Sequence, residues 1–196
     1  MEKTDLELIK EIQESTNYLK EGRLSFNTLV ARYANSVYFF IYRLTGSKEG
    51  SEDISQETFI KAWQKISKFD ANKNFKTWLF TIAKNTAIDK LRKKNAVPFS
   101  VLNILDSHND IETDFESNIM DTEDLPNEVF EKKEYFESLR IALEKLSSSE
   151  NLIISLHVTE ELTFEEISEI TNKPMNTIKS QYRRAISKLK ELLTDK

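Results

Sequence analysis

Several residue types are scarce or missing in this 196-residue chain: it has no cysteine, three glycines, three prolines and two histidines. Without cysteine it forms no disulfide, and two histidines are too few for a typical zinc site built from Cys and His. Because Gly and Pro interrupt helices, their scarcity favours a mostly helical fold. We expect no metal and no other cofactor.

Long apolar runs are missing as well. The N-terminus is charged from Glu2 onward, and the apolar run 37–42 is far shorter than the roughly 18–20 residues that cross a bilayer. The sequence also has no recognisable nucleophile arrangement, metal-ligand set or phosphate-binding loop. We therefore expect a cytoplasmic protein that is not an enzyme and has no small-molecule substrate.

The net charge of -5 hides an uneven distribution. Residues 1–96 carry 17 Lys/Arg and 12 Asp/Glu, residues 97–134 carry 2 and 11, and residues 135–196 carry 9 and 10, giving net charges of +5, -9 and -1. Within the last segment, residues 171–190 hold six basic residues and no acid. The sequence predicts two basic surfaces on either side of an acidic connector, which favours a polyanionic partner.

Apolar residues recur at helical spacing through the first half of the chain. The pattern predicts four helices: around 6–12, around 26–44 with Gly46 as its end, after Ser51, and from Asn74 as N-cap. The apolar pattern of the third helix consists of Ile54, Phe59, Ile60, Trp63 and Ile66, and that of the fourth of Phe75, Trp78, Leu79, Ile82, Ala83 and Leu91. We expect a helical domain over residues 1–95.

The periodic pattern is lost between Ala96 and Glu134. Pro98 and Pro126 interrupt this segment, and Ser, Asn and Asp are frequent. We interpret residues 96–134 as a flexible acidic linker. It is either a solvated tether or a segment whose few apolar residues contact a partner, and the sequence leaves both open.

Helical periodicity resumes in the last segment, which we expect to form a second domain over residues 135–196. Ser147 and Thr163 each precede a glutamate by three residues, the spacing of a capping box. A turn follows, in which Asn172 can adopt the left-handed conformation and Pro174 favours a helix start. A short helix, a tight turn and a longer basic helix are typical of a DNA-binding helix-turn-helix.

In the last helix, the apolar positions Ile178, Ala185, Ile186 and Leu189 are predicted to pack inward. The residues left for DNA are Asn176, Lys179, Ser180, Arg183 and Arg184. The alternative is a lysine-rich solvated face. The absence of acids across twenty residues argues against it, because a surface chosen for solubility mixes both signs.

A second basic segment runs from Lys73 to Lys94, with seven Lys/Arg and one acid, Asp89. Phe75 and Trp78 are best explained as core residues. Phe69 stands in a polar loop, where packing explains it less well. An aromatic residue there can stack on an unpaired base, and an amide such as Asn85 can read the edge of that base.

The predicted helix that precedes this basic segment carries a polar and aromatic ridge, formed by Asp53, Gln56, Glu57 and Trp63. From spacing alone, a solvated face and a protein interface explain this ridge equally well, since tryptophan is common at interface hot spots.

The two halves together resemble a known family. Asp53-x-x-Gln-Glu-x-Phe-x-x-Ala-Trp63, Phe69-Asp70 and the pattern from Phe75 to Arg92 look like region two of extracytoplasmic-function (ECF) sigma factors of bacterial RNA polymerase. Leu143-x-x-Leu146, Glu165-Glu-Ile167, Thr177-Ile-Lys-Ser180 and Arg184-Ala-x-x-Lys-Leu189 look like region four. In the turn, Asn172 replaces the usual glycine, and Lys173, Pro174 and Gln181 also depart from the family pattern.

The resemblance implies an all-α protein with two small domains, a region 2 bundle and a region 4 helix-turn-helix. It would join core RNA polymerase at the clamp helices of the largest subunit and at the flap, recognise promoter DNA and help to open it, and an anti-sigma factor would inhibit it. The resemblance assigns core binding to Asp53, Gln56, Glu57, Phe59 and Trp63. It assigns the minus-ten element to Phe69, Asp70, Asn72, Lys73, Lys84, Asn85, Lys90, Arg92 and Lys93, and the minus-thirty-five element to the outward residues of the last helix.

Two other functions compete with this one. A free-standing helix-turn-helix regulator would bind duplex DNA as a dimer without polymerase, and it would leave the ridge and Phe69 without a role. A helical adaptor would use its charges for solubility alone, and charge reversal at Lys179 and Arg183 would then leave its activity unchanged.

Overall fold

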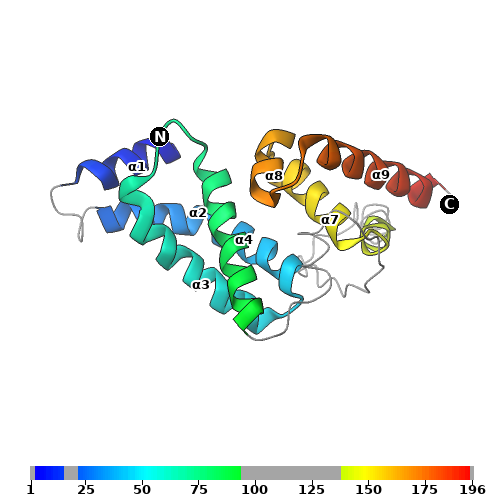
Figure 1. The fold of residues 1–196 in the computed structure, drawn as a ribbon, viewed down its shortest axis with the longest axis horizontal. Helices are drawn as coiled ribbons and strands as arrows, with labels where there is room; N and C mark the ends of the chain where they lie inside the picture. The colour runs from blue at the N-terminus through cyan, green and yellow to red at the C-terminus, as the bar shows by residue number, and fades with distance from the viewer. Residues whose placement is uncertain (1–2, 16–21, 94–137, 195–196) are drawn as a thin grey trace, which may run out of the picture.

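The computed structural model describes residues 3–15, 22–93 and 138–194 (Figure 1). The N-terminal half is formed by helices α1 (Asp5–Glu14), α2 (Arg23–Thr45), α3 (Lys48–Lys65) and α4 (Phe75–Lys93), with a short 3-10 helix, Ile66–Lys68, after α3. The C-terminal half is formed by a helical segment at 138–144, α7 (Ser148–Ile154), a π-helical turn (Ser155–Thr159), α8 (Phe164–Thr171) and α9 (Met175–Thr194). Every regular element in these described ranges is helical, which confirms the predicted fold class.

Polar residues cap the starts of α1, α3, α4, α7 and α8, whereas α2 begins after Gly22 without a side-chain cap. Thr4, Ser147 and Thr163 each form a capping box with the glutamate three residues later, so that the side chains satisfy backbone N–H groups that have no partner within the helix. The boxes at Ser147 and Thr163 confirm the prediction. The box at Thr4 was not predicted. Ser47, rather than Ser51, caps α3, so this helix begins earlier than the apolar pattern indicated.

Two helices end on residues in the left-handed conformation. Gly46 ends α2 with φ 66°, and Asn172 ends α8 with φ 59° and ψ 35°. This confirms that Asn172 takes the place of a glycine in the turn of the helix-turn-helix. Asparagine tolerates this conformation better than most residues, because its short polar side chain can bond locally.

Helix α4 begins at the predicted cap and lies inside an aromatic cluster. The Asn74 side-chain oxygen accepts a hydrogen bond from the Thr77 backbone N–H at 3.1 Å. The Phe75 ring packs against Trp78 and Tyr33, with centroid distances of 5.6 and 5.7 Å. Phe80 is fully buried and meets Phe40 of α2 edge to face, with ring centroids 5.0 Å apart. These contacts fix α4 against α2.

The two halves share one apolar core. A single cluster of buried residues runs from Leu8 in α1 to Ile178 in α9, and Phe164 and Tyr182 of the C-terminal half pack against it. A smaller cluster around Ala142, Ala185 and Leu189 belongs to the C-terminal half alone. Helix α8 packs against α4, and α7 contacts α2.

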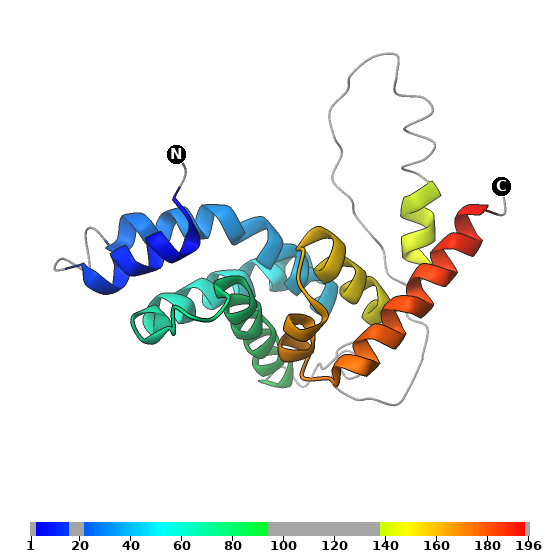
Figure 2. The same ribbon diagram turned by 90° about the horizontal axis from the view of Figure 1, so that it is seen from above.

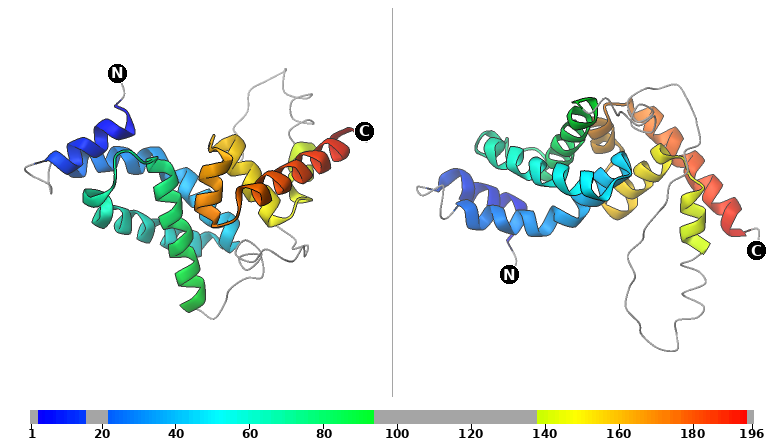
Figure 3. Two further views of the ribbon diagram at one scale, coloured as in Figure 1. Left: turned by 45° about the horizontal axis from the view of Figure 1, so that its top comes forward. Right: turned by 90° about the horizontal axis from the view of Figure 1, so that it is seen from below.

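The views agree that α4 lies between α3 and α8 (Figures 1 and 2). From below, the bundle α1–α4 and the helix-turn-helix lie side by side, with α9 extending away from the bundle (Figure 3). The predicted linker, 96–134, lies outside the described residues. The division into domains 1–95 and 135–196 therefore stays a prediction.

Candidate nucleic-acid and polymerase interfaces

The DNA-binding residues predicted on α9 share one face of this helix. Asn176, Ser180, Arg183 and Arg184 are exposed and Lys179 is half-buried. At 100° per residue, these positions cover one side of the helix, opposite the buried Ile178, Ala185 and Leu189. Ile186 is partly buried and packs against the smaller cluster, as predicted. The helix thus presents a cationic side that is free of apolar residues.

Helix α4 differs, because it is covered on two sides. Lys84, predicted to hold a phosphate, is only 7% exposed, and burial lowers its pKa. It shares a stripe with the buried Thr77 and Ile88, at spacings of seven and four residues. This stripe lies opposite Thr86, which meets Lys61 of α3, and the other helices that pack on α4 are α2 and α8. The expectation that Lys84 is available to DNA is wrong for this arrangement.

Lys90, predicted to hold phosphate, instead faces α3. Its Nζ lies 3.6 Å from a carboxylate oxygen of Asp53 and 3.7 Å from one of Glu57. Glu57 also pairs with Lys61 at 2.9 Å. The hydrogen bond from Lys61 lowers the pKa of Glu57, and the charges of Lys61, Lys90 and Lys93 add to this effect. The structure therefore joins residues that the sequence assigned to two different partners.

Phe69 is a packed residue, contrary to the expectation from its polar loop. It is 6% exposed, its ring lies 4.9 Å from Trp78, and it meets Phe75 edge to face with ring centroids 5.8 Å apart. Gln13 of α1 donates its side-chain amide to the Phe69 carbonyl at 2.8 Å. The sequence missed this because the partners of Phe69 come from the following helix and from α1.

The loop before α4 holds the other predicted minus-ten residues in an ordered turn. The Asp70 carboxylate accepts hydrogen bonds from the Asn72 backbone N–H and side-chain amide, both at 3.0 Å. Asp70, Asn72 and Lys73 are exposed. On α4 itself, the exposed candidates are Asn85, Arg92 and Lys93.

The ridge on α3 is part polar and part packed. Asp53 and Gln56 are exposed, and Glu57, Phe59 and Trp63 are half-buried. The Trp63 ring contacts Phe26 of α2, with ring centroids 5.0 Å apart. Ile60 is 57% exposed on the same side of the helix. The apolar pattern of the sequence had placed Ile60 with the residues that pack inward. Its position four residues after Gln56 was the signal that could have assigned it to the ridge.

An ion pair joins the two halves. The Lys76 Nζ on α4 lies 2.8 Å from a Glu160 carboxylate oxygen and donates a hydrogen bond to the Glu160 carbonyl at 2.7 Å. The side chains are 22% and 10% exposed. Burial lowers the pKa of Arg43, and the negative charge of Glu160 opposes that shift. Glu160 thus lies at the junction of the two halves, in the field of two cations.

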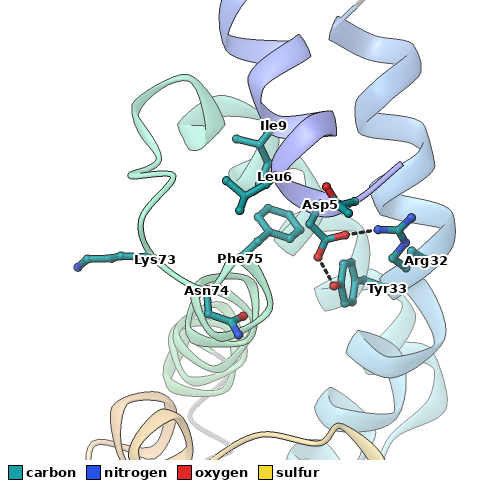
Figure 4. A pocket seen from close by; sticks show the side chains of 9 residues that line it. Asp5, Leu6, Ile9, Arg32, Tyr33, Lys73, Asn74 and Phe75 are labelled. Carbon is teal, nitrogen blue, oxygen red and sulfur yellow. Dashed lines mark hydrogen bonds and ion pairs between the residues drawn. The ribbon is translucent and has the colours of Figure 1, made fainter. Parts of the chain in front are cut away.

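A hollow of about 450 Å³ lies between α1, α2 and the loop before α4 (Figure 4). At its wall, Asp5 pairs with Arg32 and accepts a hydrogen bond from the Tyr33 hydroxyl. Burial raises the pKa of Tyr33, and the bond to Asp5 raises it further. The Lys73 side chain points away from the hollow. Since these polar groups satisfy one another, we interpret the hollow as the junction that fixes α1 on α2.

Among the described residues, no group of three or more acidic or histidine side chains could hold a metal ion. No helix in the same ranges is long and apolar enough to cross a membrane.

The fold and its two basic helices define a helical DNA-binding protein, and comparison with known proteins identifies its family. The Sigma-70 region 2 family matches residues 29–97, and the Sigma-70 region 4 family matches residues 142–191. The chain is 31% identical over 185 residues to the ECF RNA polymerase sigma factor SigW of Bacillus subtilis, covering 94% of this chain and 97% of SigW. It is 30% identical to the ECF sigma-E factor of Escherichia coli, covering 93% and 90% of the two chains.

Solved structures are similar across both halves. The structure of CnrH in complex with the cytosolic domain of CnrY superposes with a TM-score of 0.59 at 19% identity, covering 97% of each chain, and shows the same fold. The structure of RpoE of Bartonella quintana, in complex with the anti-sigma factor NepR, superposes with a TM-score of 0.59 at 26% identity. The match covers 86% of this chain and 96% of RpoE.

The chain belongs to the ECF subfamily of sigma-70 RNA polymerase sigma factors, and it directs RNA polymerase to promoters. The family is not enzymatic. This function excludes both the free-standing regulator and the solubilised adaptor.

Proposed function

We propose that three surfaces of this sigma factor bind different partners during transcription initiation. The α3 ridge binds core polymerase, the loop before α4 and the exposed side of α4 read the minus-ten element, and the basic side of α9 reads the minus-thirty-five element. The single observation that carries the proposal is the α9 face, where all five predicted residues lie opposite the buried stripe.

At the minus-thirty-five element, Arg183 and Arg184 can donate bidentate hydrogen bonds, while Lys179 acts as a point charge. Asn176 and Ser180, near the start of α9, are placed to reach base edges in the major groove. Lys179 and the arginines supply phosphate contacts and hence sensitivity to salt.

At the minus-ten element, Asn85 is the central group for capturing an unpaired base. It lies seven residues after Trp78, two turns along the same side of α4. Because Phe69 is packed beneath Trp78, we assign it the floor of this site and not an exposed stacking surface. Asp70, Asn72 and Lys73 form the adjoining loop, and Arg92 and Lys93 extend the cationic path.

At the polymerase, Gln56 and Trp63 form the centre of the ridge, with Asp53, Glu57 and Phe59 around them. We add Ile60, since an isoleucine that is 57% exposed between polar neighbours suits the apolar centre of a protein interface. The Asp53 and Glu57 carboxylates are held in place by Lys90, which links this surface to α4.

The partner and the location follow from the relatives. CnrH and RpoE were solved in complex with CnrY and the anti-sigma factor NepR. We infer that a protein of the anti-sigma class also inhibits this chain, and that it acts in the cytoplasm, where polymerase and promoters are. The predicted linker, 96–134, would pass through polymerase between the two DNA-binding halves.

Run-off transcription with purified core polymerase on genomic fragments tests the proposal. Gln56→Ala with Ile60→Ala is expected to weaken association with core, while Asn85→Ala is expected to slow promoter opening with core association unchanged. A pull-down measures association, and permanganate reactivity of unpaired thymines measures opening. Equal loss of both properties in the Asn85 variant contradicts the division of labour.

A further inference from the structure

One side chain of α1 reaches the segment that joins α3 to α4. The Gln13 side-chain amide donates a hydrogen bond to the carbonyl of Ile66 at 3.0 Å and another to the carbonyl of Phe69 at 2.8 Å. The Ile66 carbonyl also accepts the backbone N–H of Phe69 at 3.1 Å. A single amide thus bridges the short 3-10 helix and the residue that leads into the loop before α4.

Helix α1 is itself fixed on α2 by contacts that do not involve Gln13. Its apolar side is buried in the shared core. Near its end, the Ser25 hydroxyl of α2 donates a hydrogen bond to the Glu11 carboxylate at 2.7 Å. At its start, Asp5 pairs with Arg32 of α2. Gln13 therefore holds the loop against a helix that is already anchored.

The loop before α4 is held at both of its ends. At its start, the Phe69 ring packs on Trp78, and Gln13 holds the Phe69 carbonyl. Because a peptide group is planar, holding this carbonyl also fixes the direction in which the chain enters the loop. At the other end, Asn74 caps α4. Between these anchors lie the exposed side chains assigned to the minus-ten element, Asp70, Asn72 and Lys73.

The far end of the loop is less closely packed against α1. The hollow of about 450 Å³ lies there, with Asp5 and Leu6 of α1 on one side and Lys73 and Asn74 on the other (Figure 4). The loop is therefore braced where it begins and has space beside it where it ends. In this arrangement the bond from α1 to the Phe69 carbonyl controls the orientation of the loop.

We propose that Gln13 is a positioning residue for recognition of the minus-ten element. Its amide fixes the start of the loop, so that Asp70 and Asn72 meet DNA in one orientation. Groups that are held in place discriminate better between bases, because a wrong base leaves them without a hydrogen-bond partner. Gln13 lies outside the Sigma-70 region 2 match, which begins at residue 29. The inference deepens the proposed function of the loop and rests on it.

Three substitutions separate hydrogen bonding from shape at this position. Gln13→Glu keeps the shape of the side chain but has no N–H to donate at neutral pH, and Gln13→Ala removes the side chain beyond Cβ. Gln13→Lys retains an ammonium group that can donate to two carbonyls. Because Gln13 is exposed, all three variants are expected to fold, which thermal melting checks. Glu14→Ala, at the adjacent exposed position, is the matched control.

Base discrimination is measured in the holoenzyme, on a promoter found by run-off transcription and on versions of it with single-base changes in the minus-ten element. Permanganate reactivity gives the opening rate on each template. The ratio of the rate on the original promoter to the rate on the changed ones is expected to fall about three- to tenfold in Gln13→Glu and Gln13→Ala, the effect of one lost hydrogen bond. Gln13→Lys and Glu14→Ala retain the ratio, and core association in a pull-down stays unchanged in all four variants.

Unchanged discrimination in Gln13→Glu and Gln13→Ala overturns the proposal. An equal loss in Gln13→Lys also overturns it, because hydrogen-bond donation would then not be the property that matters. A wild-type holoenzyme that opens all minus-ten versions equally counts instead against the proposed function of the loop. The role of Gln13 and the role of the loop can therefore fail separately.

Hydrogen exchange of the free protein tests the brace without DNA. The Lys73 backbone N–H bonds the Asp70 carbonyl at 2.9 Å within the loop. In Gln13→Glu this N–H is expected to exchange at least about threefold faster than in the wild type, while the backbone N–H groups of α9 exchange at the same rate in both. Equal exchange at Lys73 in the two proteins overturns the bracing of the loop by α1.

Discussion

Helices α4 and α9 are both basic, both assigned to promoter DNA and almost equal in length, yet they are built differently. Helix α9 buries one stripe and exposes most of its cationic side to solvent. Helix α4 is buried through most of its circumference, because α3 covers one side and α8 another. An exposed cationic side suits duplex DNA, whose phosphates are accessible from outside. On the mostly covered α4, the predicted DNA-binding residues that remain exposed are Asn85, Arg92 and Lys93.

The largest expected effect tests whether α4 holds both halves together. Phe80→Ala removes a fully buried ring that packs on Phe40, and such a truncation costs about 3–5 kcal/mol. Because the core is continuous, we expect urea unfolding monitored by circular dichroism to shift as one transition. Ile60→Ala, at an exposed position of α3, is the control and stays within about 0.5 kcal/mol. Two separate transitions in the variant would show that the halves unfold independently.

The comparison also explains what the sequence could predict. The faces of α9 followed from helical periodicity, because α9 packs mainly on α7 and α8 of its own half of the chain. For α4, the resemblance to the family assigned Lys84 and Lys90 to DNA. Neither the burial of Lys84 nor the pairing of Lys90 with Asp53 and Glu57 leaves a local signal in the sequence. Phe69 was misread for a similar reason, as its partners lie on other elements. Local chemistry such as caps and left-handed turns was predictable, and contacts between distant segments were not.

The next largest expected effect tests whether α9 and α4 differ in DNA binding. In the holoenzyme, Arg183→Ala is expected to weaken promoter binding by about 1–3 kcal/mol if the residue reads a base, or to reduce the salt-dependence slope by about one if it contacts a phosphate. Lys90→Ala is expected to do neither, because its ammonium group is already paired with α3 carboxylates. Filter binding across a salt series measures both quantities. A slope that changes only in the Lys90 variant would reverse the assignment.

The turns that end α2 and α8 offer a smaller test. Gly46→Ala is expected to lower the free energy of unfolding by about 1–2 kcal/mol, because the left-handed conformation is unfavourable for alanine. No atom lies within 4 Å of the added Cβ, so no clash contributes. Gly46→Asn should cost less, since Asn172 occupies the same region of conformation in α8. Thermal melting of these two variants, with Asn172→Gly as the converse change, measures the difference. Equal losses from Ala and Asn at position 46 would show that side-chain bonding does not help asparagine here.

The smallest expected effect is a pH dependence that belongs to the α3–α4 contact alone. The folded-state pKa of Glu57 is lowered by Lys61, Lys90 and Lys93, so its stabilising contribution is present above the ordinary glutamate range and is lost as the pH falls through the folded-state value. Glu57→Gln should therefore unfold at a lower urea concentration than the wild type at neutral pH, and the two should converge once the pH lies below the folded-state pKa of Glu57. The effect is small because the side chain is 39% exposed. Glu52→Gln, on an exposed part of the same helix, is the control. A difference that persists unchanged through the acid range would show that packing at position 57, and not its charge, links α3 to α4.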